Sequence, residues 1–347
     1  MMQDISSTNT VGSVLDVRGL TIGFRRRAGH VRVIRNVDLT VNQSEIVGLV
    51  GESGSGKSIF ARAVLGTLPT QAEVLEGQIA FDGHDLLHMP RQQLQRLRGD
   101  RIALVPQEPM TSLNPSLRIG RQLTEVLEVH RPEMQSMARV ERAIEMLDLV
   151  GMKFPRERLA QYPHQLSGGL RQRVAIAMAL ICGRVELLIA DEPTTALDVT
   201  IQAQILDLFV RLQSVQKMSV LLITHDLGVI AQTVQRVGVM YAGEIVEMAG
   251  VEDLFAAPLH PYTRGLLDSL PRPDDAAHKS HLPSIAGAIP SPTATHHGCT
   301  FADRCSFRVE LCQRLAPELE PAGKGRFVRC FRWKELAERF VRVDVAS

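Results

Sequence analysis

The amino-acid sequence predicts an α/β fold in which a mostly parallel sheet carries helices on both faces. Short apolar runs that are typical of buried strands alternate with segments whose apolar residues recur at helical spacing. This repetition favours parallel pairing, because a connecting helix returns the chain to the same edge of the sheet. A glycine-rich loop also joins one such strand to a helix. The expected buried strands are 46–50, 102–105, 187–190 and 220–223.

The other regular elements follow in chain order. Residues 14–24 and 31–41 alternate in polarity as strands do, and a basic loop joins them. A further strand ends before Asp82-Gly83, a dipeptide that is typical of hairpin turns. We therefore expect an antiparallel β subdomain near the N-terminus. Helices are expected at 58–68, 174–181 and 201–215.

Two segments depart from the α/β alternation. The pattern from 117 to 149 is helical, which predicts a helical subdomain inserted into the core. Prolines crowd the chain past Gly250, which predicts an irregular extension that wraps around other parts. We divide the chain into an α/β core of 14–106 and 174–250, a helical subdomain of 107–173 and a C-terminal extension of 251–347.

The composition is that of a folded protein of two or three domains, with 347 residues, 45% of them hydrophobic and 22% charged. A net charge of +1 and an aromatic content of 4% argue against a nucleic-acid-binding surface. No apolar stretch approaches the roughly 20 residues that span a bilayer, and the N-terminal segment lacks a signal pattern. We expect a cytosolic protein that works at a membrane only through a partner.

The segment from Gly51 to Ser58 matches the phosphate-loop pattern G-x-x-x-x-G-K-S in full. It follows a strand and opens a helix, so backbone N–H groups and the positive helix end would face a phosphate chain. Lys57 would reach the β- and γ-phosphates, and Ser58 would hold Mg²⁺. An ordinary glycine-rich turn is the alternative. The predicted nucleotide-binding residues are Gly51, Ser53, Gly54, Ser55, Gly56, Lys57 and Ser58.

Two adjacent acids, Asp191 and Glu192, end the apolar strand 187–190. Carboxylates at the tip of a buried strand are costly unless a cation or another partner offsets them. Asp191 would hold Mg²⁺, through water, and Glu192 would polarise the attacking water as general base. The alternative is a helix N-cap pair before Pro193.

The run Ser167-Gly168-Gly169 precedes another helix and offers a second anion-binding surface. It lies between the phosphate loop and the acidic strand end, and in this respect the chain resembles the ATP-binding cassette (ABC) family. The resemblance implies a P-loop NTPase (RecA-like) core. It also implies that this run and Asp198 cap the ATP of an opposing subunit.

The same resemblance assigns three further residues. Gln107 would contact Mg²⁺ and serve as a hinge, and His225 would contact the γ-phosphate and sense its loss. Phe24 would stack on adenine. Taken alone, His225 is more often a structural residue at a strand end, and Phe24 could be a core residue.

Three phrases resemble one branch of the family, the ATP-binding subunits of oligopeptide, dipeptide and nickel importers. They are the segment 106–115, the run 167–173 with Leu170 in place of the usual Gln, and the segment 260–267. An apolar residue at Leu170 resembles the D-type subunit, in which Met is usual. The resemblance therefore implies peptide import, with nickel and glutathione import as alternatives.

The implied assembly contains a second, F-type ATPase subunit, two membrane permease subunits and an extracytoplasmic solute-binding protein, without nucleic acid. The chain would lie peripherally at the cytoplasmic face of the inner membrane. A soluble ABC ATPase of repair or translation is an alternative, but such proteins often have tandem cassettes or a long coiled-coil insertion. A redox sensor built on the cysteine-containing tail is a third possibility.

Five cysteines in a cytosolic protein argue against structural disulfides. Cys182 lies apart, in or after an apolar helix. The other four do not have the C-x2–4-C spacing of structural zinc sites, whereas iron–sulfur clusters accept wider spacings. Some relatives carry a [4Fe-4S] cluster in a similar tail, so we expect one here, with free thiols and zinc as alternatives. The expected ligands are Cys299, Cys305, Cys312 and Cys330.

Overall fold

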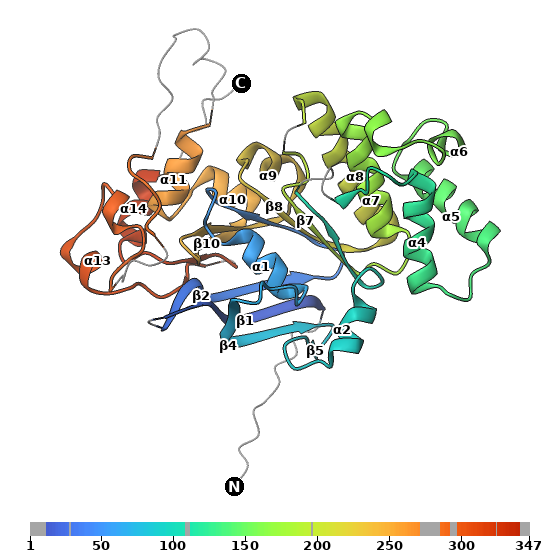
Figure 1. The fold of residues 1–347 in the computed structure, drawn as a ribbon. Helices are drawn as coiled ribbons and strands as arrows, with labels where there is room; N and C mark the ends of the chain where they lie inside the picture. Colours follow the sequence, from blue (N-terminus) through green and yellow to red (C-terminus); the bar gives the residue numbers. More distant parts are fainter. Residues whose placement is uncertain are drawn as a thin grey trace.

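The computed structural model describes residues 12–27, 29–107, 112–195, 197–270, 285–291, 297–323 and 325–340. Residues 108–111 of the segment 106–115 lie outside the described residues, as do 271–284 and 292–296 of the proline-rich region. Two β-sheets form the centre, and the inserted helices and the C-terminal extension lie at opposite ends (Figure 1).

The smaller sheet is the expected antiparallel one, with strand order β2-β1-β4-β5. Asp82 and Gly83 connect β4 and β5 and have left-handed φ angles of 49° and 76°. These angles are typical of a two-residue hairpin turn, which explains why the dipeptide was informative. The strands are β1 (Ser13–Arg26), β2 (Gly29–Asn42), β4 (Ala72–Phe81) and β5 (His84–Asp85).

The larger sheet has the order β11-β12-β10-β9-β3-β8-β7-β6. The strands from β9 to β6 pair in parallel, as the strand–helix alternation predicts. The parallel strands are β3 (Ile46–Val50), β6 (Ile102–Val105), β7 (Leu187–Asp191), β8 (Ser219–Thr224) and β9 (Arg236–Tyr241). Because their carboxyl ends lie along one edge, the residues that follow them meet there.

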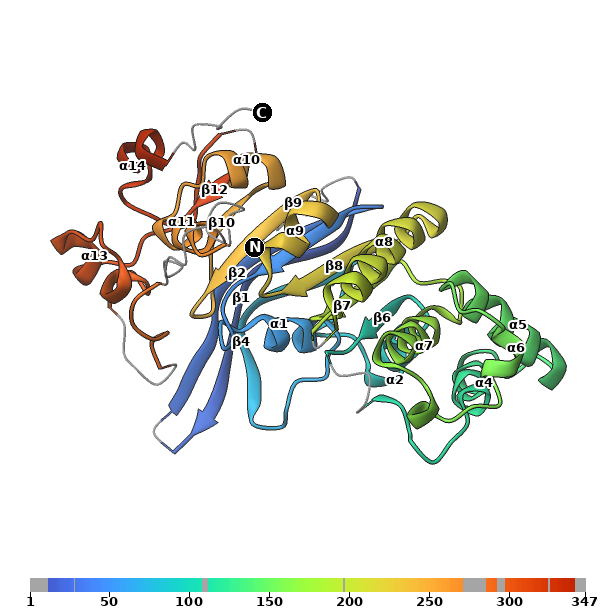
Figure 2. The same ribbon diagram turned by 90° about the horizontal axis from the view of Figure 1, so that it is seen from above.

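The C-terminal extension is more regular than its prolines suggest. Its strands β11 (Glu320–Pro321) and β12 (Phe327–Val328) continue the larger sheet beyond β10 (Glu244–Gly250) in antiparallel pairing. Its short helices pack around this edge (Figure 2). They are α10 (Val251–Ala256), α11 (Pro261–Asp268), a 3₁₀ turn (Ala302–Arg304), α13 (Glu310–Arg314) and α14 (Trp333–Phe340).

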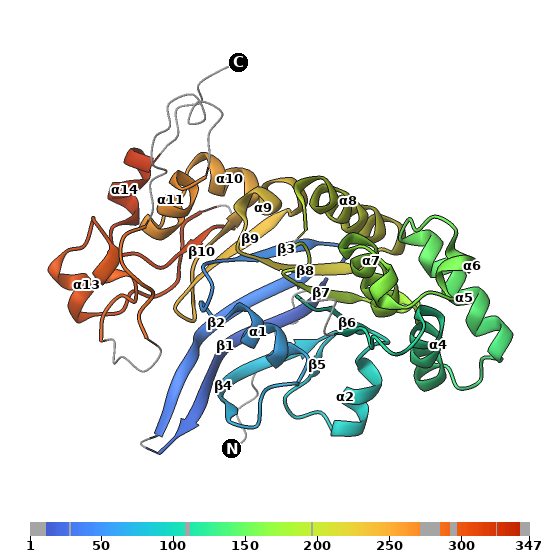
Figure 3. The same ribbon diagram turned by 45° about the horizontal axis from the view of Figure 1, so that its top comes forward.

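Alternate residues of the central strands face two different cores. Leu187 and Ile189 of β7 pack with α1 (Lys57–Val64) and the smaller sheet. Leu188 and Ala190 of the same strand pack with helices on the other face. These helices are α7 (Gly168–Leu180), α8 (Val199–Gln216) and α9 (Leu227–Thr233), and Figure 3 shows the sheet between them and α1.

The predicted helical subdomain contains two main helices, α4 (Ile119–His130) and α5 (Ser136–Leu149), which pack on α7. The remaining helical elements among the described residues are α2 (Arg91–Leu97), α6 (Pro155–Arg158) and a 3₁₀ turn (Pro163–Gln165). Within the described parts of the chain, no helix has the length and apolar character needed to traverse a bilayer.

Candidate functional site

The loop Gly51–Ser58 connects β3 to α1 at the carboxyl edge of the parallel strands. Its first glycine has no space for a side chain, because an added Cβ would lie 2.1 Å from the carbonyl oxygen of Met240. Gly56 precedes α1 with a left-handed φ of 110°, where an added Cβ would also lie 2.8 Å from Ile34. The motif glycines at these two positions are therefore required by the backbone path.

A cavity of about 660 Å³ opens beside this loop and collects residues from the ends of several strands. Gln107 follows β6, Glu192 follows β7 and His225 follows β8, and all three line it with Lys57 and Ser58. With Ser53, Gly54 and Gly56 of the loop, eight residues that the sequence singles out line the cavity. The C-terminal extension contributes Leu266, Ile289, Pro290 and Ser291 to the same wall.

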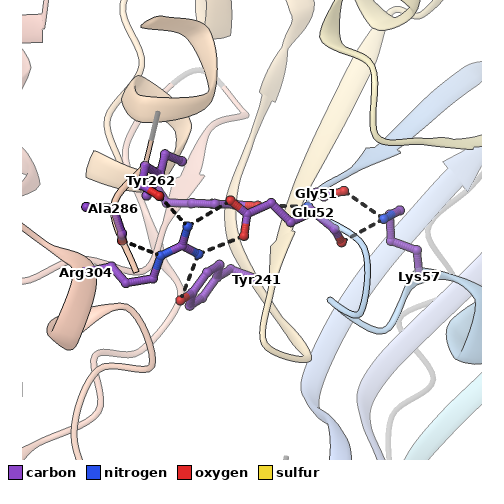
Figure 4. Close-up of polar contacts among 8 residues, drawn as sticks. Gly51, Glu52, Lys57, Tyr241, Tyr262, Ala286 and Arg304 are labelled. Atoms are coloured by element: carbon purple, nitrogen blue, oxygen red, sulfur yellow. Dashed lines mark hydrogen bonds and ion pairs between the residues drawn. The ribbon is translucent and has the colours of Figure 1, made fainter. Parts of the chain in front are cut away.

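Lys57 is buried at the start of α1, and its ammonium group is held by the loop itself (Figure 4). Its Nζ donates to the carbonyl oxygens of Gly51 at 2.7 Å and Glu52 at 3.1 Å. Burial lowers the pKa of Lys57, and the nearby carboxylates of Glu192, Asp191 and Glu52 oppose that shift. The site therefore holds a partly desolvated cation, which would gain from a phosphate group.

Ser58 and Asp191 form an oxygen-rich pair beside the lysine. The hydroxyl of Ser58 donates to Oδ1 of Asp191 at 3.2 Å. Burial raises the pKa of Asp191, and the Ser58 hydrogen bond partly offsets this. A buried carboxylate next to a hydroxyl is the ligand set that Mg²⁺ prefers when phosphates supply further oxygens.

The carboxylate of Glu192 is the meeting point of three polar side chains. Its Oε2 accepts hydrogen bonds from Nε2 of Gln107 and from Oγ1 of Thr195, both at 3.0 Å. Nδ1 of His225 lies 3.2 Å from the same oxygen. The backbone of Glu192 has a left-handed φ of 47°, and its side chain is 12% exposed. Backbone strain at a non-glycine residue that is held by three partners is typical of functional positions.

The run Ser167–Gly169 does not line this cavity and lies at the N-terminus of α7, where Ser167 and Gly168 are exposed and Gly169 is buried. Ser167 caps α7, and Asp198 caps the neighbouring helix α8 by accepting from Ile201 N at 2.9 Å. The two helix ends are adjacent, because a Cβ added at Gly168 would lie 3.5 Å from Leu197. Neither helix end lines the cavity beside the chain's own phosphate loop.

Phe24 is at the end of β1, paired with Val31. Of the described residues in β1 and β2, Arg32, Val33 and Arg35 of β2 line the cavity, and Phe24 of β1 does not. The predicted stacking role of Phe24 stays a prediction.

The cavity is also lined by residues that the sequence does not single out: Arg32, Val33, Arg35, Glu52, Ile59, Thr195, Ala242, Leu266, Ile289, Pro290 and Ser291. Thr195 could have been found from the sequence, because it lies only three residues after Glu192. Nothing in the local sequence indicates that residues of the extension line the cavity, since this depends on long-range folding.

The four C-terminal cysteines line one small, separate cavity together with His260 and Phe301. Burial raises the pKa of Cys299 to about 12 and that of Cys330 to about 11, so these thiols are protonated at neutral pH. In the part of the chain that the structure describes, no three Cys, His, Asp or Glu side chains converge closely enough to hold a metal ion as they stand.

Comparisons with known proteins give consistent results along the chain. Residues 34–195 match the ABC transporter family, and residues 246–312 match the oligopeptide/dipeptide transporter C-terminal region. The chain is 46% identical to the dipeptide transport ATP-binding protein DppD of Bacillus subtilis, covering 94% of this chain and 97% of the relative. It is 44% identical to the oligopeptide transport ATP-binding protein OppD of Haemophilus influenzae, covering 92% and 97%.

Solved structures are similar over the cassette. A dimeric, post-hydrolysis ATP-binding cassette bound to ADP and Pi matches with a TM-score of 0.61 and 27% identity, covering 68% of this chain and 98% of that chain. A dimeric bacterial ABC transporter cassette matches with the same TM-score at 28% identity, with the same coverage.

Proposed function

The chain belongs to the ABC transporter family, and from this premise we propose that it binds ATP with Mg²⁺ and hydrolyses it to power the import of peptides. The cargo class rests on the C-terminal region and on the relatives, which are named for dipeptide and oligopeptide transport. Nickel and glutathione import remain the alternatives that these sequence features allow.

Lys57 and the loop N–H groups are proposed to hold the phosphate chain. The buried ammonium group is already aimed at the loop interior by its bonds to Gly51 and Glu52. Ser58, Asp191 and Gln107 would hold Mg²⁺, which neutralises phosphate charge when it is bound. The proximity of Ser58 and Asp191 supports this assignment.

Glu192 is proposed as the general base. The position of its carboxylate is the observation on which the mechanism rests most directly. Glu192 lines the cavity, and Gln107, Thr195 and His225 all contact Oε2 of its carboxylate. A base held in this way can accept a proton from water that attacks a γ-phosphate. His225 would contact that phosphate, and its loss after hydrolysis would release the contact.

The exposed ends of α7 and α8 are proposed to complete the site of a second subunit. Ser167, Gly168 and Gly169 begin α7 beside Asp198 at the start of α8, and none of the four lines the cavity of their own loop. An ATP molecule would then be held between two subunits, and its hydrolysis would separate them. Such a two-state element is what mechanical coupling requires.

Transport requires permease subunits and a solute-binding protein, which the ABC importer family implies. We further propose that the second ATPase is an F-type subunit and that the chain binds peripherally at the cytoplasmic face of the inner membrane.

The direct test is peptide uptake by the purified transporter in liposomes, with ATP supplied on the side of this chain. Labelled di- and oligopeptides should accumulate with the wild-type chain and not with Glu192→Gln. Uptake that persists with Glu192→Gln would contradict the role of the site. ATP-dependent uptake of nickel or glutathione without peptide uptake would replace the proposed cargo.

We also propose a [4Fe-4S] cluster at the four cysteines. The donor set supports it, because Cys299, Cys305, Cys312 and Cys330 surround one cavity, although the thiols would have to move inward and lose their protons. Iron and acid-labile sulfide in anaerobically purified protein, lost in Cys305→Ser but kept in Cys182→Ser, would support the cluster. Tightly bound zinc without iron or sulfide, or free thiols alone, would overturn it.

A further inference from the structure

An ion pair between buried Arg304 and partly exposed Glu52 connects the C-terminal extension to the phosphate loop. The guanidinium of Arg304 donates to both carboxylate oxygens of Glu52, at 2.7 and 3.0 Å (Figure 4). The Arg304 side chain is only 6% exposed, and it also donates to the carbonyl oxygens of Ile285 and Ala286. A bidentate pair with this many supporting bonds is a fixed contact and not a surface ion pair.

A second contact from the extension holds the backbone of the same residue. The amide of Glu52 donates to the hydroxyl of Tyr262 at 2.9 Å. Tyr262 is fully buried, with its ring centroid 4.6 Å from that of Tyr241 and 5.4 Å from that of Phe301. The extension therefore fixes both the main chain and the side chain of Glu52.

Glu52 lies where a negative charge matters for nucleotide binding. It is the second residue of the phosphate loop and lines the cavity. Its carbonyl oxygen accepts from Lys57, and its carboxylate is close enough to oppose the lowering of the pKa of that lysine by burial. A carboxylate left without its arginine at this position would repel a triphosphate.

We propose that Arg304 and Tyr262 are positioning residues through which the C-terminal extension sets the affinity of the phosphate loop for ATP. Arg304 neutralises Glu52 and holds its carboxylate toward the extension. Tyr262 fixes the loop backbone at the same residue. This inference rests on the proposed nucleotide site and assigns it a control element from outside the cassette core.

The position of Arg304 is tied to the cysteine cavity. Arg304 ends the 3₁₀ turn Ala302–Arg304, and the flanking residues Phe301, Ala302 and Cys305 all line that cavity. Rearrangement of the cavity would therefore move the group that holds Glu52.

The test is calorimetric titration of the full chain with MgATP and MgADP. Arg304→Ala should weaken MgATP binding about tenfold, and MgADP binding less, because the repulsion grows with the charge of the nucleotide. Arg304→Lys should retain most of the affinity. The double variant Glu52→Gln/Arg304→Ala should recover affinity relative to Arg304→Ala, which loss of a purely structural contact would not allow. The matched control is Arg264→Ala, which removes an ion pair to Asp268 in the same extension.

Tyr262→Phe keeps the buried ring and removes only the hydroxyl, so it tests the proposal even if Arg304→Ala does not fold. It should weaken MgATP binding about fivefold. Wild-type MgATP affinity in folded Arg304→Ala and in Tyr262→Phe would overturn the inference, as would a double variant no better than Arg304→Ala. Failure of the wild-type chain itself to bind MgATP would instead overturn the proposed function.

Discussion

The carboxylate of Glu192 lies 3.2 Å from Nδ1 of His225, although the two residues end different strands of the larger sheet. The same oxygen accepts from Gln107, which follows a third strand. The contact follows from the parallel order of β6, β7 and β8, which places the three strand ends at one edge. A change in this contact upon loss of a phosphate would therefore shift residues both in the α/β core and at Gln107, where the helical subdomain begins.

Replacing Glu192 by Gln should abolish turnover while leaving nucleotide binding intact. The amide retains the shape and hydrogen bonds of the carboxylate but cannot accept a proton, so kcat should fall about 10²–10⁴-fold. Steady-state phosphate release and MgATP titration of the same preparation measure the two effects. Turnover within a few-fold of wild type would exclude Glu192 as the base.

Replacing Lys57 by Ala should have the opposite pattern, with binding lost before chemistry is reached. The buried ammonium is the cation proposed to contact the phosphates, so affinity for MgATP should fall about 100-fold or more. Equilibrium titration measures this. A comparison with Lys217→Ala, at the end of α8, controls for the general loss of one positive charge. Equal affinity in the Lys57 and Lys217 variants would contradict the proposed phosphate contact.

Asp191 should make the nucleotide-free protein less stable at neutral pH. Burial raises its pKa above the value in the unfolded chain, so its contribution to stability is fully present at low pH and is lost as the pH rises through the folded-state pKa. Asp191→Asn removes this ionisation and can still accept from Ser58. Its Tm without nucleotide should rise by about 2 °C at pH 7–8, and the gain should shrink toward pH 4.

The same variant should lose Mg²⁺-dependent hydrolysis, because the carboxylate proposed to hold the metal would have lost its charge. Calorimetric scans at several pH values and activity assays check the two halves. A lower Tm for Asp191→Asn at pH 7–8 would show that the carboxylate stabilises the free protein and would contradict this account.

Gly168→Glu should distinguish nucleotide binding at the chain's own site from the chain's contribution to the site of its partner. Gly168 is exposed at the first turn of α7, and a Cβ there meets only Leu197 at ordinary contact distance, 3.5 Å. An acid in the first turn of a helix is tolerated or slightly stabilising, but it would repel a phosphate bound by an opposing subunit. The variant should keep its Tm and its own MgATP affinity and lose more than about 90% of the activity of the paired subunits.

Much of the fold could be predicted from the sequence because its signals are local. The runs 46–50 and 102–105 match β3 and β6 residue for residue, and Asp82-Gly83 forms the expected hairpin turn. The positions of Ser58, Asp191 and His225 could also be predicted. Asp191 and His225 lie at the ends of apolar strands, and Ser58 ends the loop that follows another one.

Long-range contacts could not be predicted in this way. Nothing near Arg304 in the sequence indicates a partner at Glu52, since only the folded extension brings the two residues together. The short strands β11 and β12 had no periodic signal, because each contains just two residues and depends on pairing with β10. The packing of two distant segments, and not local pattern, decides such features.

The central claim is that one subunit holds ATP with its phosphate loop while an opposing subunit covers it. The most direct measurement is the mass in solution of Glu192→Gln mixed with the second ATPase subunit of its transporter, with and without MgATP. The account predicts separate subunits without nucleotide, a closed pair with MgATP, and no pair when Gly168→Glu is added. Subunits that stay separate at saturating MgATP would contradict it.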